Sequence, residues 1–176
     1  MKSILAISGS LRSGSSSHAI LHFLRQLVPP GITFTIYDNL AQIPPFDPGL
    51  DHESPPDTVV ELRSFINHAD ALVICTPEYA FGIPGQLKNS LDWMVSSGTL
   101  ADKPVALITA SSSGEYAHPS LLRTLGALSA NVIESASLLI SFIRSKMDSK
   151  GDITDAQTEK SLRAAFNTLL KEIESK

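Results

Sequence analysis

The residues best suited to binding a ligand lie in the segment 8–18, which consists mainly of serine and glycine. Six hydroxyls and one guanidinium are available there, from Ser8, Ser10, Arg12, Ser13, Ser15, Ser16 and Ser17. Small residues let the backbone approach a ligand closely, and a helix that follows adds the positive end of its dipole. Hydroxyls and guanidinium groups are well suited to holding phosphate. The segment therefore predicts a phosphate-binding loop. The alternative is a flexible serine-rich turn that ends in an ordinary helix cap.

Two common phosphate motifs do not fit this segment. Gly9 and Gly14 have the spacing of a Walker loop, but Ser15 stands where that motif requires lysine. The dinucleotide pattern Gly-x-Gly-x-x-Gly is also missing, because position 11 is leucine. A monophosphate is the ligand that fits this segment best.

A second candidate loop, residues 76–85, follows another apolar run and contains aromatic and proline residues. Tyr79 and Phe81 offer a wall for a planar heterocycle, and the prolines stiffen the loop. Free backbone amides in such a loop can hydrogen-bond the edge of a ring. The alternative is a structural turn in which the two aromatic side chains simply pack.

Apolar runs and helical spacing predict the elements that position these loops. Strands are expected over residues 3–8, 32–37, 71–76, 104–110 and 137–142. Helices are expected over about 15–28, 57–68, 84–97 and 120–130, with a last helix that starts at a capping box, residues 154–157. The proline-rich segment 40–56 is expected to be a loop that serves function or covers another part of the molecule.

Strands and helices alternate along the chain, and the strands are apolar throughout, which favours a parallel sheet covered on both faces. We therefore expect an α/β fold, a three-layer flavodoxin-like sandwich with strand order 2-1-3-4-5, as a single domain over residues 1–176. In that order the first and third strands are neighbours. Their two loops would then meet where such sheets bind ligands.

Composition narrows the class of protein further. Of the 176 residues, 43% are hydrophobic and 18% are charged, which is typical of a globular domain. The net charge of −4, without a basic run, argues against nucleic-acid binding. No stretch is long and apolar enough to span a bilayer, so a cytoplasmic protein without a membrane partner is expected.

Several residues that could carry chemistry have simpler interpretations. The lone Cys75 lies in an apolar run and is expected to be buried and inert. His22, His52 and His68 lack partners at metal-ligand spacing, so no metal site is predicted. His18 and His118 are expected at the surface. Other minor expectations are an ion pair between Lys88 and Asp92 and a place for Trp93 in the core.

Three segments together resemble the NADPH-dependent FMN reductase family, which includes bacterial quinone and chromate reductases and azoreductases. They are Gly9-Ser-Leu-Arg12 with Ser15, Pro77-Glu-Tyr79, and Pro84-Gly-Gln-Leu-Lys-Asn-Ser-Leu-Asp-Trp93. The similarity of order and spacing covers nearly the whole chain.

The resemblance implies an FMN site, with NADPH or NADH as the electron donor. It implies that Ser10, Arg12 and Ser15 hold the phosphate and that Pro77, Glu78 and Tyr79 lie beside the isoalloxazine ring. A third flavin loop is implied at Ser111, Ser112, Ser113 and Gly114. The chain departs from the family at Ser17 and Ala80, where asparagine is usual, and in a third loop with less glycine.

The function expected from this resemblance is electron transfer from NAD(P)H through FMN to a small acceptor. Quinones, azo compounds, metal oxyanions or free flavin are the candidate acceptors, and a homodimer or homotetramer is expected. No catalytic side chain is predicted, because the flavin itself carries the redox chemistry. Two alternatives stay open: a flavin- or nucleotide-binding module without turnover, and a flavodoxin-like electron-transfer protein. The second alternative usually has a far more acidic surface.

Overall fold

The computed structural model describes residues 2–51 and 54–175. Its five strands form one parallel sheet in the order β2-β1-β3-β4-β5. The strands are β1 (Lys2–Ser8), β2 (Ile32–Tyr37), β3 (Ala71–Thr76), β4 (Pro104–Ala110) and β5 (Asn131–Ile140). The predicted fold class and strand order are confirmed.

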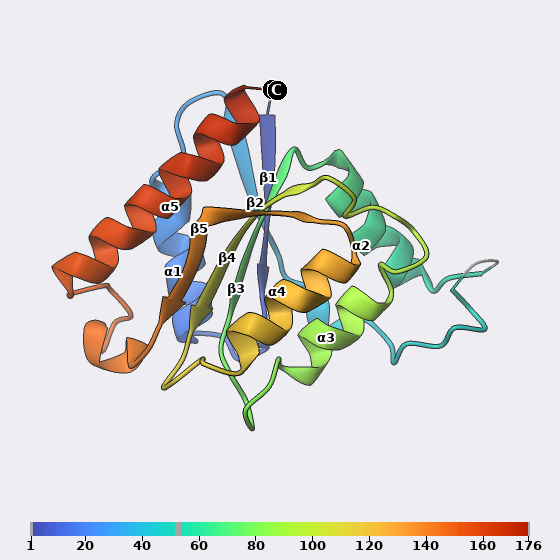
Figure 1. The fold of residues 1–176 in the computed structure, drawn as a ribbon, viewed down its shortest axis with the longest axis horizontal. Coiled ribbons are helices and arrows are strands. Elements are labelled where there is room, and N and C mark those ends of the chain that lie inside the picture. The colour runs from blue at the N-terminus through green and yellow to red at the C-terminus, as the bar shows by residue number, and fades with distance from the viewer. Residues whose placement is uncertain (1, 52–53, 176) are drawn as a thin grey trace.

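Helices cover both faces of the sheet (Figure 1). One face packs against α1 (Ser16–Gln26) and α5 (Ala156–Glu174), and the other against α2 (Asp57–His68), α3 (Gly85–Asp92) and α4 (Ala117–Ala127). Because side chains alternate along a strand, β1 sends Ile4 and Ala6 into the first core and Leu5 and Ile7 into the second. Every residue of β3 and β4 is buried, which explains why these strands are apolar throughout.

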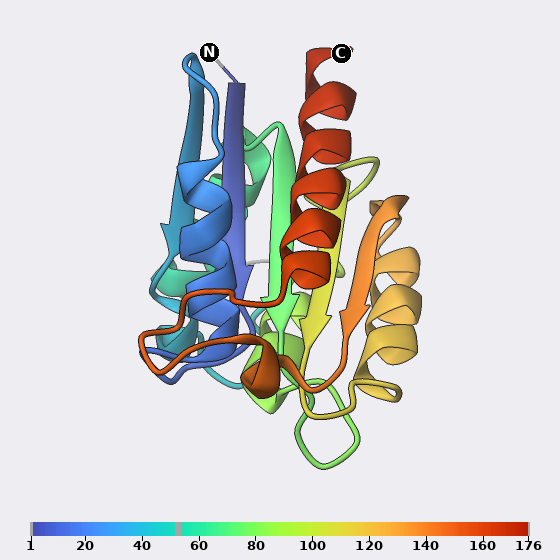
Figure 2. The same cartoon turned by 90° about the vertical axis from the view of Figure 1, so that its left-hand side faces the viewer.

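The carboxyl ends of all five strands lie at one edge of the molecule, where the arrowheads meet in Figure 2. At this edge the chain leaving β1 crosses the end of β3 closely. The backbone N–H of Gly9 donates to the carbonyl of Cys75 at 2.8 Å. A Cβ on Gly9 would lie 2.2 Å from Thr76 Oγ1, so only glycine fits at this crossing.

Residues 40–46 of the proline-rich segment 40–56 are held against α3, and His52 and Glu53 lie outside the described residues. The short 3₁₀ turn η1 (Leu40–Gln42) opens it. The Asn89 side chain donates to the carbonyl of Pro44 at 2.8 Å and accepts the N–H of Phe46 at 2.7 Å. The indole of Trp93, fully buried in the core, also donates to Pro44. Residues 40–46 therefore cover α3, as the expectation of a covering loop allowed.

The boundaries of α3 and β5 differ from those predicted. α3 ends at Asp92 rather than near residue 97, because residues 93–97 continue as turns. β5 begins at Asn131, six positions before the predicted start at 137, and its register against β4 shifts between Val105 and Leu107. It is an edge strand, so exposed residues such as Glu134 and Ser135 interrupt the apolar pattern that signals a strand.

The starts of α4 and α5 also differ. α4 begins at Ala117, about three residues earlier than predicted. The carboxylate of Asp155, not the hydroxyl of Thr154, caps α5 by accepting the N–H of Thr158 at 2.8 Å, so the predicted capping box is wrong. Within residues 2–51 and 54–175, no helix has the length and apolar character needed to cross a membrane.

Candidate functional site

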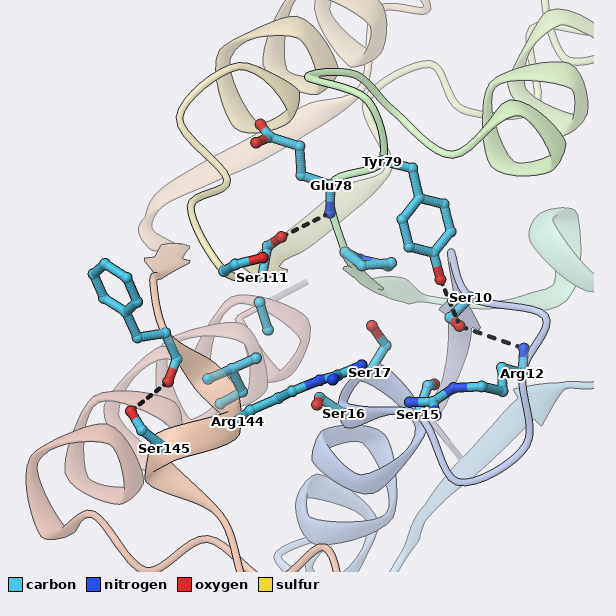
Figure 3. A pocket seen from close by; sticks show the side chains of 15 residues that line it. Ser10, Arg12, Ser15, Ser16, Ser17, Glu78, Tyr79, Ser111, Arg144 and Ser145 are labelled. Carbon is cyan, nitrogen blue, oxygen red and sulfur yellow. Dashed lines mark hydrogen bonds between the residues drawn. The ribbon is translucent and has the colours of Figure 1, made fainter.

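A cavity of about 560 Å³ opens at the carboxyl edge of the sheet, between the ends of β1, β3 and β4 (Figure 3). Pockets for small ligands usually measure roughly 300–1,000 Å³. The cavity is lined by nine of the predicted site residues, Ser10, Arg12, Ser15, Ser17, Pro77, Glu78, Tyr79, Ser111 and Ser112. The sheet thus brings together three loops that are far apart in the sequence.

The start of α1 forms one end of this cavity. Ser15 caps the helix, because its hydroxyl accepts the N–H of His18 at 3.3 Å. The backbone N–H groups of Ser16 and Ser17 have no acceptor within the helix, as in any first turn. The hydroxyl of Ser17 is buried, and its only partner among the described residues is the weakly bonding thiol of Cys75. These groups leave several hydrogen-bond donors available to an anion.

Two guanidinium groups point toward this helix start from opposite sides of the cavity (Figure 3). Arg12 comes from the loop after β1, and Arg144 comes from the 3₁₀ turn η2 (Ile143–Lys146), which follows β5. Neither guanidinium has a hydrogen-bond or ion-pair partner among residues 2–51 and 54–175. Two unpaired cations beside a helix N-terminus form a site with the charge and donors that a phosphate requires.

Sequence reasoning missed Arg144. The η2 turn is held against the third loop, since Phe142 and Ile143 donate their N–H groups to the carbonyls of Ser112 and Ser111. Phe142 itself has the left-handed backbone conformation, with φ 56°, which turns the chain back toward the cavity. A cation directly after the last strand is the only sequence signal that could have pointed to it.

The loop between β3 and α3 forms the opposite wall. Its backbone is tied to the third loop by the N–H of Glu78, which donates to Ser111 Oγ at 3.2 Å. The Tyr79 hydroxyl lies 3.3 Å from Ser10 Oγ and so joins this wall to the loop after β1. Backbone and aromatic surface, rather than charge, face the middle of the cavity.

The carboxylate of Glu78 turns away from the cavity and caps α4. It accepts the backbone N–H groups of Ala117 at 2.7 Å, Tyr116 at 2.8 Å and Gly114 at 3.3 Å. Burial opposes ionisation of this carboxylate, but the three hydrogen bonds lower its pKa below the usual value. Glu78 therefore locks two of the loops that line the cavity into one arrangement.

Three predicted site residues do not line the cavity: Ala80, Ser113 and Gly114. Ala80 and Phe81 form the tip of a two-residue hairpin, with φ 47° and 58°, between the paired backbones of Tyr79 and Gly82. This turn favours asparagine followed by glycine, because both central residues have positive φ. The tip lies outside the cavity, so the side chain at position 80 influences the conformation of the turn.

Both histidines expected at the surface are partly buried instead. His18 Nδ1 lies 3.0 Å from Ser15 Oγ and 3.2 Å from Ser8 Oγ, beside the loop after β1. The His118 ring lies between Thr109 Oγ1 at 2.8 Å and Ser137 Oγ at 3.1 Å. Burial lowers the pKa of both rings.

Other side chains in the described residues are structural. Cys75 is buried, and burial raises the pKa of its thiol to about 12. Lys88 and Asp92 form the predicted ion pair at 2.5 Å. The described residues contain no cluster of three or more histidine, cysteine, aspartate or glutamate side chains that could hold a metal; His52 lies outside them.

Sheet order, cavity position and the cation-lined helix start define a flavodoxin-like protein with a site for a phosphorylated, planar ligand. The family described as NADPH-dependent FMN reductase matches residues 2–144. The chain belongs to this family, so it is an oxidoreductase of the type that uses FMN and NAD(P)H.

Individual relatives agree with this assignment. The chain is 32% identical to an NAD(P)H-dependent FMN reductase of Pseudomonas aeruginosa over 172 residues, 94% of this chain and 92% of the relative. It is 32% identical to a quinone reductase of Escherichia coli over 162 residues, 88% of this chain and 86% of the relative. A solved structure of FerB, a flavoenzyme NAD(P)H:(acceptor) oxidoreductase from Paracoccus denitrificans, superimposes with a TM-score of 0.85 at 25% identity, covering 99% of this chain and 98% of that one.

Proposed function

We propose that residues 1–176 act as one FMN-binding domain that passes electrons from NAD(P)H to a small acceptor. The observation that carries this proposal is a single cavity with a phosphate site at one end and an aromatic, amide-lined wall at the other. The residues that line the cavity fit FMN. The buried, nearly unpartnered hydroxyl of Ser17 and two unpaired guanidinium groups suit its phosphate, and the volume suits its ring.

The phosphate would be held by Ser10, Arg12, Ser15 and Ser17, together with the free N–H groups of the first turn of α1. Arg144 would contact it from the far side. This end of the cavity would supply binding affinity and fix the position of FMN, because charge-assisted hydrogen bonds to phosphate are strong and directional.

The ring would lie between the β3–α3 loop and the third loop. Pro77, Tyr79 and the backbone of Glu78 would form one side, and Ser111 and Ser112 would offer their hydroxyls to the ring edge. Ala80, Ser113 and Gly114 would shape these loops from outside the cavity. When bound, FMN would supply the redox chemistry between NAD(P)H and the acceptor. The protein would orient the ring and offer hydrogen-bond donors along its edge.

The acceptor would enter at the open mouth of the cavity. Quinones, azo compounds, metal oxyanions and free flavin are the acceptor classes that we propose. We place this activity in the cytoplasm, where NAD(P)H is supplied.

We also propose a homodimer or homotetramer. Exposed aromatic side chains in the loops around the site support this, since Phe81 and Phe142 are 74% and 70% exposed and Phe81 packs edge-on against Tyr116 at 5.0 Å. Exposed apolar groups gathered beside a site are typical of an interface. Light scattering coupled to gel filtration measures the assembly, and a monomer at micromolar concentration contradicts it.

Two measurements test the central proposal. Protein saturated with FMN and then freed of excess should keep the visible flavin absorbance; if the absorbance never stays with the protein, FMN binding is refuted. NADPH or NADH oxidation should then depend on an added quinone. Flavin binding without any turnover would instead indicate a non-catalytic module. Accumulation of a stable one-electron form during dithionite titration would indicate an electron-transfer protein.

A further inference from the structure

The ring of His18 lies against the hydroxyl that caps α1. Its Nδ1 atom is 3.0 Å from Ser15 Oγ and 3.2 Å from Ser8 Oγ, and both serines are buried. Ser15 is one of the residues proposed above to hold the phosphate, whereas His18 does not line the cavity proposed for FMN. The ring therefore reaches the proposed phosphate site through a serine hydroxyl.

The hydrogen bonds of Ser8 determine which atom donates in its contact with His18. A serine hydroxyl has a single hydrogen, and Ser8 donates it to the carbonyl of Ser10 at 3.0 Å, because a carbonyl only accepts. The contact between Ser8 and His18 then requires a hydrogen on Nδ1. The carbonyl of Arg12 also accepts a hydrogen bond from the ring, which favours the protonated ring. The surroundings of His18 thus select a ring that carries a hydrogen on Nδ1.

The hydrogen on Nδ1 determines what Ser15 can offer a ligand. The Ser15 hydroxyl accepts the backbone N–H of His18 at 3.3 Å and has a single hydrogen to donate. When Nδ1 carries a hydrogen, the ring donates to Ser15 Oγ, and the hydrogen of Ser15 is available to a phosphate oxygen. When Nδ1 lacks it, the ring is an acceptor that takes the Ser15 hydrogen. A hydrogen on Nδ1 and a phosphate bound at Ser15 therefore favour one another.

The charges around His18 allow a ligand to change its protonation. Burial has the largest effect and lowers the pKa of the ring; Asp38 raises that pKa, and His22 lowers it. The first turn of α1 also opposes a positive charge. A cavity of about 890 Å³ opens beside the ring, and the other charged side chains that line it are Arg12, Arg144, Asp148, Lys150 and Asp152. The negative charge of a phosphate at Ser15 would favour the protonated ring, against burial and the helix dipole.

We propose that His18 is a positioning residue for the phosphate of the ligand, donating from Nδ1 to Ser15 Oγ and taking up a proton when the ligand binds. Water in the cavity beside the ring supplies this proton, and the neutral imidazole becomes imidazolium. The identity of the ligand as FMN rests on the proposed function, whereas the coupling of His18 to a phosphate does not.

The first test compares FMN with riboflavin, which lacks the phosphate, by flavin fluorescence between pH 5.5 and 8.0. His18→Leu removes both the donor and the charge, so it should weaken FMN about threefold to tenfold at pH 6 and leave the Kd for riboflavin unchanged. In His18→Asn a side-chain amide can donate from near the position of Nδ1 but cannot take up a proton. His18→Asn should therefore bind FMN as tightly as the wild type at pH 8.

The pH profile separates the proton from the hydrogen bond. The ratio of the Kd for FMN of the wild type to that of His18→Asn should rise about threefold from pH 5.5 to 8.0, as the loss of one partly screened ion pair gives. The phosphate's own titration affects both proteins and cancels in this ratio. His68→Asn is the matched control, because exposed His68 ends α2 on the opposite face of the sheet from α1, and its ratio should not change with pH.

Nuclear magnetic resonance of the ring nitrogens tests the same inference in flavin-free protein. We expect a hydrogen on Nδ1 of His18 at pH 8, and we expect inorganic phosphate, but not chloride at equal ionic strength, to raise the pKa of His18. A hydrogen on Nε2 alone overturns the proposal, as does an unchanged pKa with phosphate or a Kd ratio that does not vary with pH. Equal weakening of FMN and riboflavin in His18→Leu also overturns it, since His18 would then act on the fold of the loop. Failure of the protein to retain FMN refutes the proposed function alone, because the tautomer and the phosphate titration still decide this inference.

Discussion

Replacing Arg144 by glutamine removes one of the two unpaired guanidinium groups at the helix start. Each hydrogen bond to a charged group contributes about 1.5–3 kcal/mol. Both arginines are exposed, so water competes for the contact and the lower end of that range applies. We expect Arg144→Gln to weaken FMN by about tenfold, since roughly 1.4 kcal/mol corresponds to that factor.

The assay compares FMN with riboflavin, which has the same ring but no phosphate. Flavin fluorescence on titration with protein measures the Kd for each. Arg144→Gln and Arg12→Gln should both weaken the binding of FMN and leave the Kd for riboflavin unchanged. In the double variant the loss of binding free energy should differ from the sum of the two single losses, because both arginines contact the same phosphate. Arg123→Gln is the matched control, because exposed Arg123 lies on α4, on the opposite face of the sheet from α1.

Two results would refute this reasoning. An unchanged Kd for FMN in Arg144→Gln would show that the second guanidinium does not contact the phosphate. An equal loss for FMN and riboflavin would show that Arg144 acts on the ring or on the fold of the cavity.

Four more predictions follow from the geometry. Burial lowers the pKa of His118 from its usual value of 6.5, so near and below pH 6.5 the unfolded chain binds more protons than the folded chain. The free energy of unfolding, measured by urea titration, should therefore fall from pH 7.5 to 5.5. In His118→Gln that fall should be smaller. Glu78→Ala should cost about 1–2 kcal/mol at pH 7 by uncapping α4. Because hydrogen bonding lowers the pKa of Glu78, that cost should shrink as the pH falls from 4.5 through the lowered value. Ala80→Asn should raise Tm by roughly 2–4 °C by relieving about 1 kcal/mol of left-handed strain, with the Kd for FMN unchanged. Cys75 should resist a thiol reagent at pH 8 in the native state and react fully in urea; native labelling at the rate of a free thiol would contradict its burial.

Much of the fold was predictable because its signals are local. The buried strands β3 and β4 are continuous apolar runs, and helices such as α1 show their period directly. β5 was predicted too short, since an edge strand carries polar residues that break the run. The capping box failed by one residue, because Thr154 and Asp155 are both good caps and only the packed helix selects between them.

The site was predictable only where its chemistry lies in one segment. The phosphate loop and the β3–α3 loop are recognisable from their own residues, and nine of the twelve predicted positions line the cavity. The role of Glu78 was not predictable, because whether its carboxylate faces a ligand or the N-terminus of α4 depends on a loop that follows 36–39 residues later.

By itself, the sequence determined the element order and membership of an FMN reductase family, and it predicted a phosphate-binding loop over residues 8–18. These properties depend on neighbouring residues, whose types set local hydrogen bonding and burial. Only the tertiary structure decided that Arg144 joins Arg12 at the start of α1. The physical reason is that packing of parallel strands brings the ends of β1 and β5 to one edge, and no local pattern encodes the distance between segments so far apart in the chain.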